Sequence, residues 1–184
     1  MRYPKEIILK DGHEAVIRHL EKSDEAALRE FYAHIPESDR WFMFYDVMNP
    51  LVIRKLIDGI GTGTVYSIVA LSDEKIIAHA SLHLSGFGCT AHMGRLRIMV
   101  LPEYRHKRLG TWMLLDLIQL AMDKGLSELR ADFISGIEDA AIDSAVKLDF
   151  FKRAVLEDYV KDPEGRRHHL LIMIKRLHRN WGDF

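Results

Sequence analysis

A predicted strand, a short basic turn and a long predicted helix follow one another without interruption in the middle of this sequence. Met93–Leu101 has the composition of a strand. In the turn Tyr104–Thr111, the tyrosine is followed by four consecutive arginine, histidine or lysine residues. Apolar residues then recur on one helical face across Thr111–Lys124. A further strand at Leu126–Phe133 means that this helix joins two strands and must pack on a sheet. The chain is therefore expected to belong to the α/β class.

Shorter elements surround this unit on both sides. Asp11-Gly12 supplies a hairpin turn, Ser23 is predicted to cap the first helix, and Pro50 stands at the first position of the second. Because a strand meander precedes the long helix, we expect a mixed, mostly antiparallel central sheet flanked by helices. The predicted strands are Ile7–Leu9, Glu14–Leu20, Val65–Leu71, Ile76–Leu84, Phe151–Val160 and Arg167–Ile174, and the other predicted helices are Ser23–Ile35, Asn49–Ile60 and Asp139–Leu148.

Composition limits the class of protein. With 184 residues, 48% of them hydrophobic, the chain suits one globular domain covering residues 1–184. A formal net charge of −1 gives no overall basic field, so we expect no nucleic-acid partner. Cys89 is the sole cysteine, which fits a reducing compartment, and no apolar run is long enough to cross a bilayer. We therefore expect a cytoplasmic protein without a membrane partner.

The basic turn is chemically suited to holding a phosphate. Arg105, His106, Lys107 and Arg108 stand directly before a helix N-terminus, where backbone amides and the helix dipole favour anions. Gly110 allows the backbone to come close to a ligand. Charge runs usually face water and nothing else. The position of this one between a strand and a helix is what favours a phosphate site.

The stretch from Ile98 to Leu115 resembles the central motif of the GNAT superfamily of acyl-CoA-dependent N-acyltransferases. The family motif is Gln/Arg-x-x-Gly-x-Gly/Ala, which this chain fills with Arg105 first and Gly110 last. Arg108 takes the place of the first family glycine. That departure either adds a cation to the phosphate contact or marks a loop that has drifted from its ancestral use. The order of elements resembles the family fold from about residue 15 to residue 177.

The resemblance implies acetyl-CoA as co-substrate and no metal. In the family, a bulge or splay beside the central strand exposes backbone donors to the thioester carbonyl and the pantetheine arm. The matching strand residues are Ile98, Met99 and Val100, and the residues implied to grip the pyrophosphate are Arg105, His106, Lys107, Arg108, Leu109, Gly110 and Thr111.

Acyl transfer to an amine also requires proton transfer. A lysine-like amine must lose a proton before attack, often to a carboxylate. Some relatives place a glutamate where this chain has Arg95, which cannot act as a base. Among Asp132, Glu103 and Glu138, we predict Asp132 as the catalytic carboxylate, although a strand-end aspartate more often faces solvent. In many relatives the tyrosine that protonates the thiolate stands four residues before a Gly-Phe pair. That pair corresponds here to Asp149-Phe150 and the tyrosine to Ala145, so water or the substrate's own proton must serve.

Other candidate site residues have plainer explanations. His79 and His83 share a strand face but stand about 13 Å apart at the usual rise, too far for one ion, and no metal is expected. Trp41, Phe42, Phe44 and Tyr45 are candidates for the amine pocket, although such aromatics more often belong to a core.

The leading hypothesis is an N-acetyltransferase that moves an acetyl group from acetyl-CoA to a primary amine by direct attack in a ternary complex. The amine belongs to a protein lysine or a small molecule, and a homodimer is allowed. Leu9–Phe42 is similar to the opening segment of bacterial protein-lysine acetyltransferase domains. The alternative is a catalytically silent acyl-CoA-binding sensor or regulatory module, because Arg95, Arg108, Ala145 and Asp149 occupy family positions that usually carry other residues.

Overall fold

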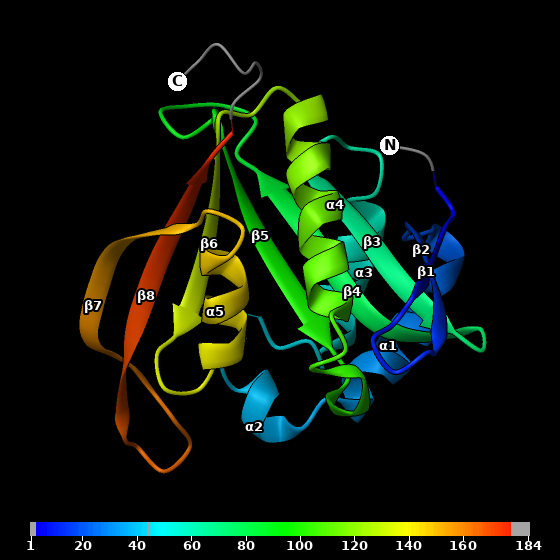
Figure 1. Ribbon diagram of the computed structural model, residues 1–184, viewed down its shortest axis with the longest axis horizontal. Helices are drawn as coiled ribbons and strands as arrows, with labels where there is room; N and C mark the ends of the chain where they lie inside the picture. The colour runs from blue at the N-terminus through cyan, green and yellow to red at the C-terminus, as the bar shows by residue number, and fades with distance from the viewer. Residues whose placement is uncertain (1–2, 44, 178–184) are drawn as a thin grey trace.

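The computed structural model describes residues 3–43 and 45–177, and over these residues the fold is built on one mixed sheet (Figure 1). The strand order is β1-β2-β3-β4-β5-β6-β8-β7. All neighbouring pairs are antiparallel except β5 and β6, which run parallel. The strands are β1 (Lys5–Ile8), β2 (Glu14–His19), β3 (Val65–Ser72), β4 (Lys75–Leu84), β5 (Met93–Val100), β6 (Glu128–Ile134), β7 (Phe151–Lys161) and β8 (Arg167–Arg176). The predicted α/β class and mixed, mostly antiparallel sheet are confirmed.

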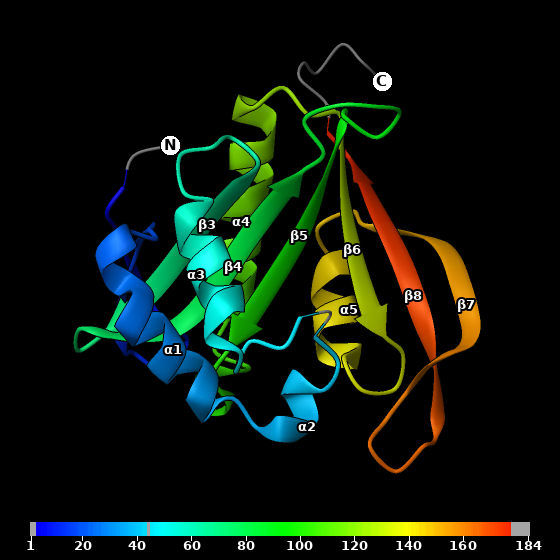
Figure 2. The ribbon, with the colours of Figure 1, turned by 180° about the vertical axis from the view of Figure 1, so that it is seen from behind.

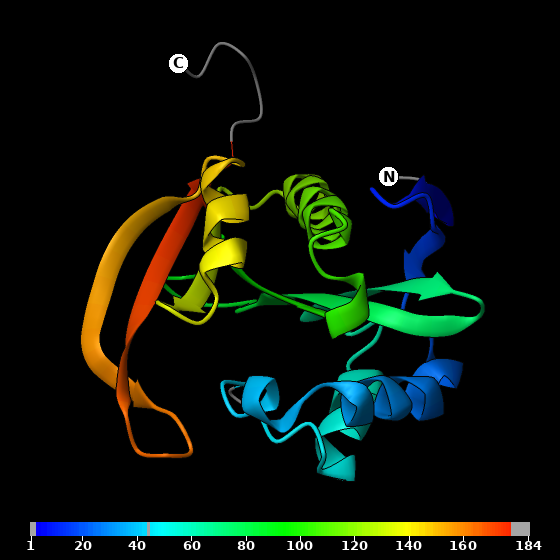
Figure 3. The same ribbon diagram turned by 60° about the horizontal axis from the view of Figure 1, so that its bottom comes forward.

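Helices cover both faces of this sheet. Figure 3 shows α4 and α5 on one side and α1, α2 and α3 on the other. None of the helices in the described ranges is long and apolar enough to span a membrane. The helices are α1 (Glu25–His34), α2 (Glu37–Arg40), α3 (Pro50–Asp58), α4 (Leu109–Asp123) and α5 (Asp139–Val146), with 3₁₀ turns at η1 (Lys22–Asp24) and η2 (Pro102–Tyr104).

Two helix starts differ from the sequence-based expectation. Ser23 does not cap the first helix, because it lies inside the 3₁₀ turn η1. The carboxylate of Asp24 instead accepts the amide of Glu21 at 2.8 Å and pairs with Arg18, so α1 begins only at Glu25. The long helix α4 begins two residues earlier than expected, at Leu109, because the backbone turns at Arg108. The short helix α2 after Pro36 was not expected at all.

The core explains why α4 is fixed so firmly to the sheet. Leu109, Met113, Leu117 and Ala121 lie one helical turn apart and are almost fully buried. A Cβ atom on Gly94 of β5 would come within 2.8 Å of the buried side chains of Leu82 and Leu126, so this strand and its neighbours are packed to contact. The start of β5 is therefore closely packed against its neighbours.

The parallel pair β5–β6 is closed at one end only. Its register covers Met93 to Arg95 of β5 against Glu128 to Arg130 of β6. Beyond Arg95, β5 continues to Val100 paired with β4 alone, while β6 continues to Ile134 paired with β8 alone. Figure 2 shows the two strands diverging from this closed end. The sheet is thus split into two halves, with an opening between them.

Candidate active site

The split between β5 and β6 forms the large cavity of the molecule, with a volume of about 710 Å³. Its walls are Leu96 to Val100 on one side and Ala131 to Phe133 on the other. From Leu96 onward β5 has no strand partner on this side, so backbone amide and carbonyl groups along that edge face the opening. The predicted residues Ile98, Met99 and Val100 all line this cleft.

The start of α4 forms one end of the cleft and has the geometry of an anion site. His106 and Arg108 adopt left-handed backbone conformations, with φ of 59° and 68°. Such conformations turn successive amides toward one concavity. The first amides of a helix have no partner inside the helix, and no side chain caps α4. Together with the apolar walls of the cleft, these donors fit the pyrophosphate and pantetheine arm of a coenzyme A thioester.

The predicted turn residues line the cleft, with the exception of Lys107. Arg105, His106, Arg108, Leu109, Gly110 and Thr111 all border it. The ammonium of Lys107 instead lies 2.6 Å from Asp11 in the β1–β2 turn and over the ring of Tyr104. Its side chain is therefore held outside the cleft.

Arg105 has a structural role in addition to its place in the cleft wall. Its Nε donates to the carbonyl of Val100 at 3.0 Å, and its guanidinium donates to Asp39 of α2 at 2.6 Å. A guanidinium engaged twice has fewer donors left for a phosphate. Arg108 therefore adds a further positive charge at the mouth of the cleft, with the ring of His106 also lining it.

Asp132 lies in the cleft wall, but its carboxylate is engaged by two arginines. Arg95 donates to one oxygen at 2.5 Å, and the Nε of Arg130 donates to the other at 2.7 Å. The side chain of Asp132 is only 2% exposed. To take a proton from an amine, this carboxylate would have to weaken charge-assisted hydrogen bonds.

Glu138 is a second carboxylate in the same wall, just before α5, with a different environment. One of its oxygens accepts the amide of Ile134 at 2.6 Å. Burial raises the pKa of Glu138 above its usual 4.5, although the Ile134 amide and the nearby Arg97 oppose that shift. Glu103 is exposed on the turn after β5 and does not border the cleft. A partly buried carboxylate whose pKa is raised holds a proton more readily than an exposed one, which suits a general base.

Ala145 borders the cleft from α5 and carries no proton donor. Asp149, in the place of a family glycine, adopts a left-handed conformation with φ of 59°, and the following Phe150 is buried. The backbone turn after α5 is therefore retained without the glycine.

The aromatic residues before α3 are less buried than expected. Trp41 and Tyr45 are 51% and 55% exposed, and Phe42 lines the cleft. The expectation that these aromatics belong to the core is wrong for these three, because Phe42 borders the cleft, Tyr45 borders a smaller cavity and Trp41 donates to a backbone carbonyl at the end of β7. Phe44 lies outside the described residues.

The histidines have structural surroundings. His79 is buried and its Nδ1 lies 2.7 Å from the hydroxyl of Tyr32 on α1. His83 bonds Ser81 on the same strand at 2.9 Å. Among residues 3–43 and 45–177, no group of three histidine, cysteine or acidic side chains is arranged to hold a metal ion.

Arg97 is the site residue that sequence reasoning missed. It borders the cleft and also a smaller cavity on the opposite side of β5 from Leu96. The signal was present in the sequence, because Arg95 and Arg97 stand two apart in a predicted strand and must share a face.

Comparison with known proteins supports what the geometry indicates. A model of the acetyltransferase (GNAT) family matches residues 18–150. The GNAT domain of S. lividans PAT is 14% identical with a TM-score of 0.77, covering 96% of this chain and 100% of that one. Ribosomal-protein-S5-alanine acetyltransferase from Vibrio fischeri is 15% identical with a TM-score of 0.76, covering 90% and 94%.

A Salmonella typhimurium protein solved with its cofactor acetyl-CoA is 23% identical with a TM-score of 0.72, covering 91% of this chain and 96% of that chain. Sequence comparison with curated proteins gives no match. The structural neighbours agree on the fold, and the family match extends over most of the chain. The chain therefore belongs to the acetyltransferase (GNAT) family and is an N-acetyltransferase.

Proposed function

We propose that this enzyme transfers an acetyl group from acetyl-CoA to a primary amine, of a protein lysine or a small molecule, by direct attack in a ternary complex. The observation that carries the proposal is the split of β5 from β6 with the uncapped start of α4 at its mouth. The Salmonella typhimurium neighbour holds acetyl-CoA as its cofactor, which supports the choice of acyl donor.

Residues of the turn and of β5 would bind different parts of acetyl-CoA. Backbone amides at 106–111, with Arg108, would hold the pyrophosphate, and the apolar walls would hold the pantetheine arm. Acetyl-CoA supplies the acyl group as a thioester. Backbone donors along the open edge of β5, at Ile98 to Val100, would polarise the thioester carbonyl.

Glu138 is our proposed general base in preference to Asp132. Both line the cleft, but Asp132 is held by Arg95 and Arg130, whereas burial raises the pKa of Glu138. Asp132 then acts as the group that positions two arginines. Ala145 leaves the departing thiolate to be protonated by water or by the proton of the amine itself.

Titration calorimetry with acetyl-CoA tests the first part of the proposal. Binding at micromolar concentration supports it, and no heat up to high micromolar concentration would sink it. Release of free thiol with a panel of amines and peptides tests the second part. A protein that binds acetyl-CoA but releases thiol only at the hydrolysis background would be an acyl-CoA sensor. The single exposed Cys89 suits a reducing, cytoplasmic location, which we propose on that ground.

A further inference from the structure

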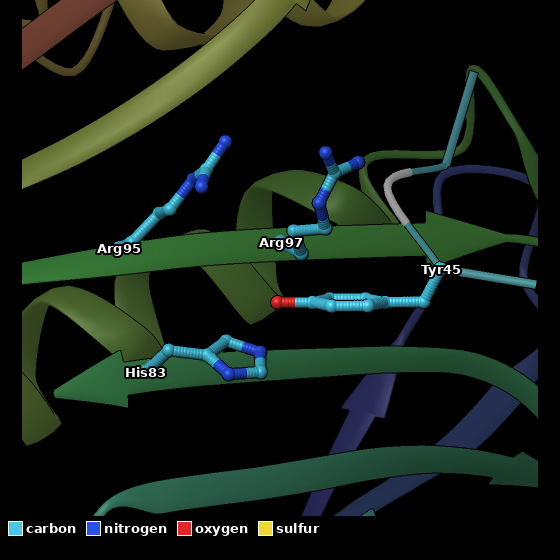
Figure 4. Close-up of a pocket in the computed structure, with 4 residues that line it drawn as sticks. All are labelled: Tyr45, His83, Arg95 and Arg97. Carbon is cyan, nitrogen blue, oxygen red and sulfur yellow. The ribbon is translucent and has the colours of Figure 1, made fainter. Parts of the chain in front are cut away.

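A second, smaller cavity lies beside the cleft, and its lining is strongly basic. It has a volume of about 40 Å³ and is lined by Tyr45, His83, Arg95 and Arg97. Figure 4 shows the side chains of Arg95 and Arg97 rising from β5 in the same direction, with the Tyr45 hydroxyl directed toward the ring of His83. A volume of this size holds roughly three water molecules. It suits one small polar group and not a whole side chain.

The register of the sheet places this cavity on the face that carries α1. His83 pairs with Arg95, and the next residue pair on that face is Ser81 with Arg97. Directly paired residues of antiparallel strands point to the same side. His79, two positions further along that face, contacts Tyr32 of α1. The cavity is therefore on the opposite face of the sheet from α4.

Arg97 connects the cavity with the cleft, because it lines both. A ligand group held in the cavity would thus lie within one side chain of the open edge of β5. This arrangement allows a single small molecule to place one end in the cavity and the other end at the thioester.

The lining of the cavity favours an anion. Two of its four residues are arginines, and none of the four is acidic. Arg95 and Arg130 both pair with the carboxylate of Asp132. Glu138, Asp132 and Tyr45 favour the charged form of Arg97, whereas Arg95 opposes it. An anion that enters the cavity would meet two guanidiniums and no carboxylate of the lining.

The two other lining groups are hydrogen-bonding partners and not competing anions. Burial, with Arg97 and Arg95 beside it, lowers the pKa of His83, and the Nε2 of its ring bonds Ser81, which leaves Nδ1 as its second hydrogen-bonding atom. Tyr45 adds a phenolic hydroxyl. Burial also lowers the pKa of Arg97, and Arg95 adds to this shift, so an anion nearby would relieve an unfavourable environment.

We propose that the cavity receives the carboxylate of the acceptor, so that the acetylated molecule is a small amino acid-like compound carrying an amine and a carboxylate. Arg97 and Arg95 bind the carboxylate, His83 and Tyr45 add hydrogen bonds, and the amine extends past Arg97 into the cleft. This inference rests on the proposed function, because it names the acceptor of that same reaction. It narrows the acceptor from any primary amine to one with a carboxylate a few bonds from the nitrogen.

Matched acceptors test the proposal directly. Free amino acids with short and long side chains, each paired with its own carboxamide, are offered with acetyl-CoA, and thiol release is measured. We expect kcat/KM for the acid to exceed that for its amide by at least about tenfold. Equal use of acid and amide, or preference for the amide, overturns the proposal, as does turnover confined to lysine side chains of peptides.

Substitutions in the lining then test whether the preference for the acid over its amide arises in the cavity. Arg97→Gln should reduce the acid-to-amide ratio to near one, mainly through KM, and Arg97→Lys should keep part of the ratio. Tyr45→Phe, at a half-exposed position that the fold tolerates, should lower the ratio about threefold. Arg153→Gln, an exposed arginine on β7, is the matched control and should leave the ratio unchanged. A ratio unaffected in both Arg97→Gln and Tyr45→Phe contradicts the proposal.

A binding measurement separates this inference from the proposed function. N-acetylated amino acids and the corresponding N-acetylated amides are titrated into the protein by calorimetry, with and without coenzyme A. Tighter binding of the acid, lost in Arg97→Gln, supports the cavity even if no turnover is found. If the protein binds acetyl-CoA and acetylates amines but does not discriminate between acid and amide, the proposed acetyltransferase function stands. The proposal that the cavity binds a carboxylate is then wrong.

Discussion

Six of the described non-glycine residues hold left-handed backbone conformations, and two of them lie beside helices that border the cleft. Arg108 and Asp149 stand where related sequences have glycine, and both have φ near 60° in the left-handed region. This conformation costs a branched or long side chain about 1 kcal/mol or more, while aspartate tolerates it better. The turn before α4 thus keeps its shape at a cost in stability, and Arg108 places its charge at the cleft mouth, where a phosphate would bind.

Replacing Arg108 with glycine should separate the two effects. We expect Arg108→Gly to raise the free energy of unfolding of the ligand-free protein by about 1 kcal/mol, which corresponds to roughly 3 °C in Tm. Acetyl-CoA binding should weaken several-fold and become less dependent on salt. Asp149→Gly, the control, should stabilise less and leave acetyl-CoA binding unchanged. Unaltered affinity in Arg108→Gly would show that the arginine does not contact phosphate.

The two carboxylates of the cleft are also distinguished by single substitutions. Glu138→Gln should lower kcat about 10²- to 10³-fold, as expected for loss of a general base. Because burial raises the pKa of Glu138, activity of the wild type should rise with pH through a value above 4.5, and that acidic limb should vanish in Glu138→Gln.

Asp132→Asn should act differently, because its carboxylate pairs with Arg95 and Arg130. We expect a loss of about 1–2 kcal/mol of stability, with a smaller fall in kcat and the pH profile retained. If Asp132→Asn instead removes the acidic limb while Glu138→Gln retains it, then Asp132 is the base. Steady-state kinetics from pH 5 to 9 with denaturation curves of both variants decide between them.

At the scale of elements, the split depends on how firmly β5 and β6 are closed at one end. Gly94 lies in the three-residue parallel pairing, and a Cβ there would come 2.6 Å from Leu82 and 2.8 Å from Leu126. Those side chains are buried, so a shift of either leucine would disturb the close packing of the core around it. The glycine is thus required by packing, not by turn geometry.

Two glycine-to-alanine variants should therefore change stability in opposite directions. Gly94→Ala should lower the free energy of unfolding by about 1–3 kcal/mol through overpacking. Gly110→Ala in the first turn of α4 meets only Val100, at 3.9 Å, and should raise it by about 0.5–1 kcal/mol. Denaturant unfolding of the ligand-free proteins measures both. An unchanged or raised stability in Gly94→Ala would mean that the closed end of the split is not tightly packed.

The contact between α1 and β4 should make stability depend on pH. Burial lowers the pKa of His79 to about 3, well below the unfolded value of about 6.5. Between pH 3 and pH 6.5 the His79 ring is protonated in the unfolded chain and neutral in the folded one. The contribution of His79 to the free energy of unfolding is therefore full above pH 6.5 and is lost as the pH falls. This group contributes a loss of roughly 2 kcal/mol between pH 7.5 and pH 5. His79→Gln should remove that part of the pH dependence, and an equal slope in both proteins would contradict it.

The elements themselves were largely predictable from the sequence. Apolar periodicity and turn residues located every strand of the sheet and the helices α1, α3, α4 and α5 to within a few residues. α2 was missed because a four-residue helix has no periodicity to detect. In the site, the family motif located the turn and the β5 residues. It could not show that Lys107 pairs with Asp11 or that Arg97 lines two cavities, because those contacts join residues far apart in sequence.

At the scale of the whole molecule, the cleft separates a half built on β1–β5 from a half built on β6–β8, and α2 connects them at the open end. Asp39 of α2 accepts from Arg105 on one side of the split. The indole of Trp41, directly after α2, donates to the carbonyl of Lys161 at the end of β7 at 2.7 Å. Figure 1 shows α2 at the end of the molecule where β5 and β6 are furthest apart. The half-sheets are therefore linked both by the short parallel pairing and by this helix.

Trp41→Phe keeps an aromatic ring and deletes the indole N–H, so it tests whether this link sets the width of the opening. The lost hydrogen bond contributes about 1 kcal/mol, and because Trp41 is half-exposed the fold should survive. We expect faster amide hydrogen exchange near Lys161, a KM for the amine raised several-fold, and an unchanged Kd for acetyl-CoA, since the turn before α4 is untouched. Trp112→Phe on α4 is the matched control and should leave exchange near Lys161 as it is in the wild type. If Trp41→Phe alters neither exchange at the end of β7 nor the KM, this hydrogen bond does not set the width of the opening, and α2 does not shape the acceptor side of the cleft.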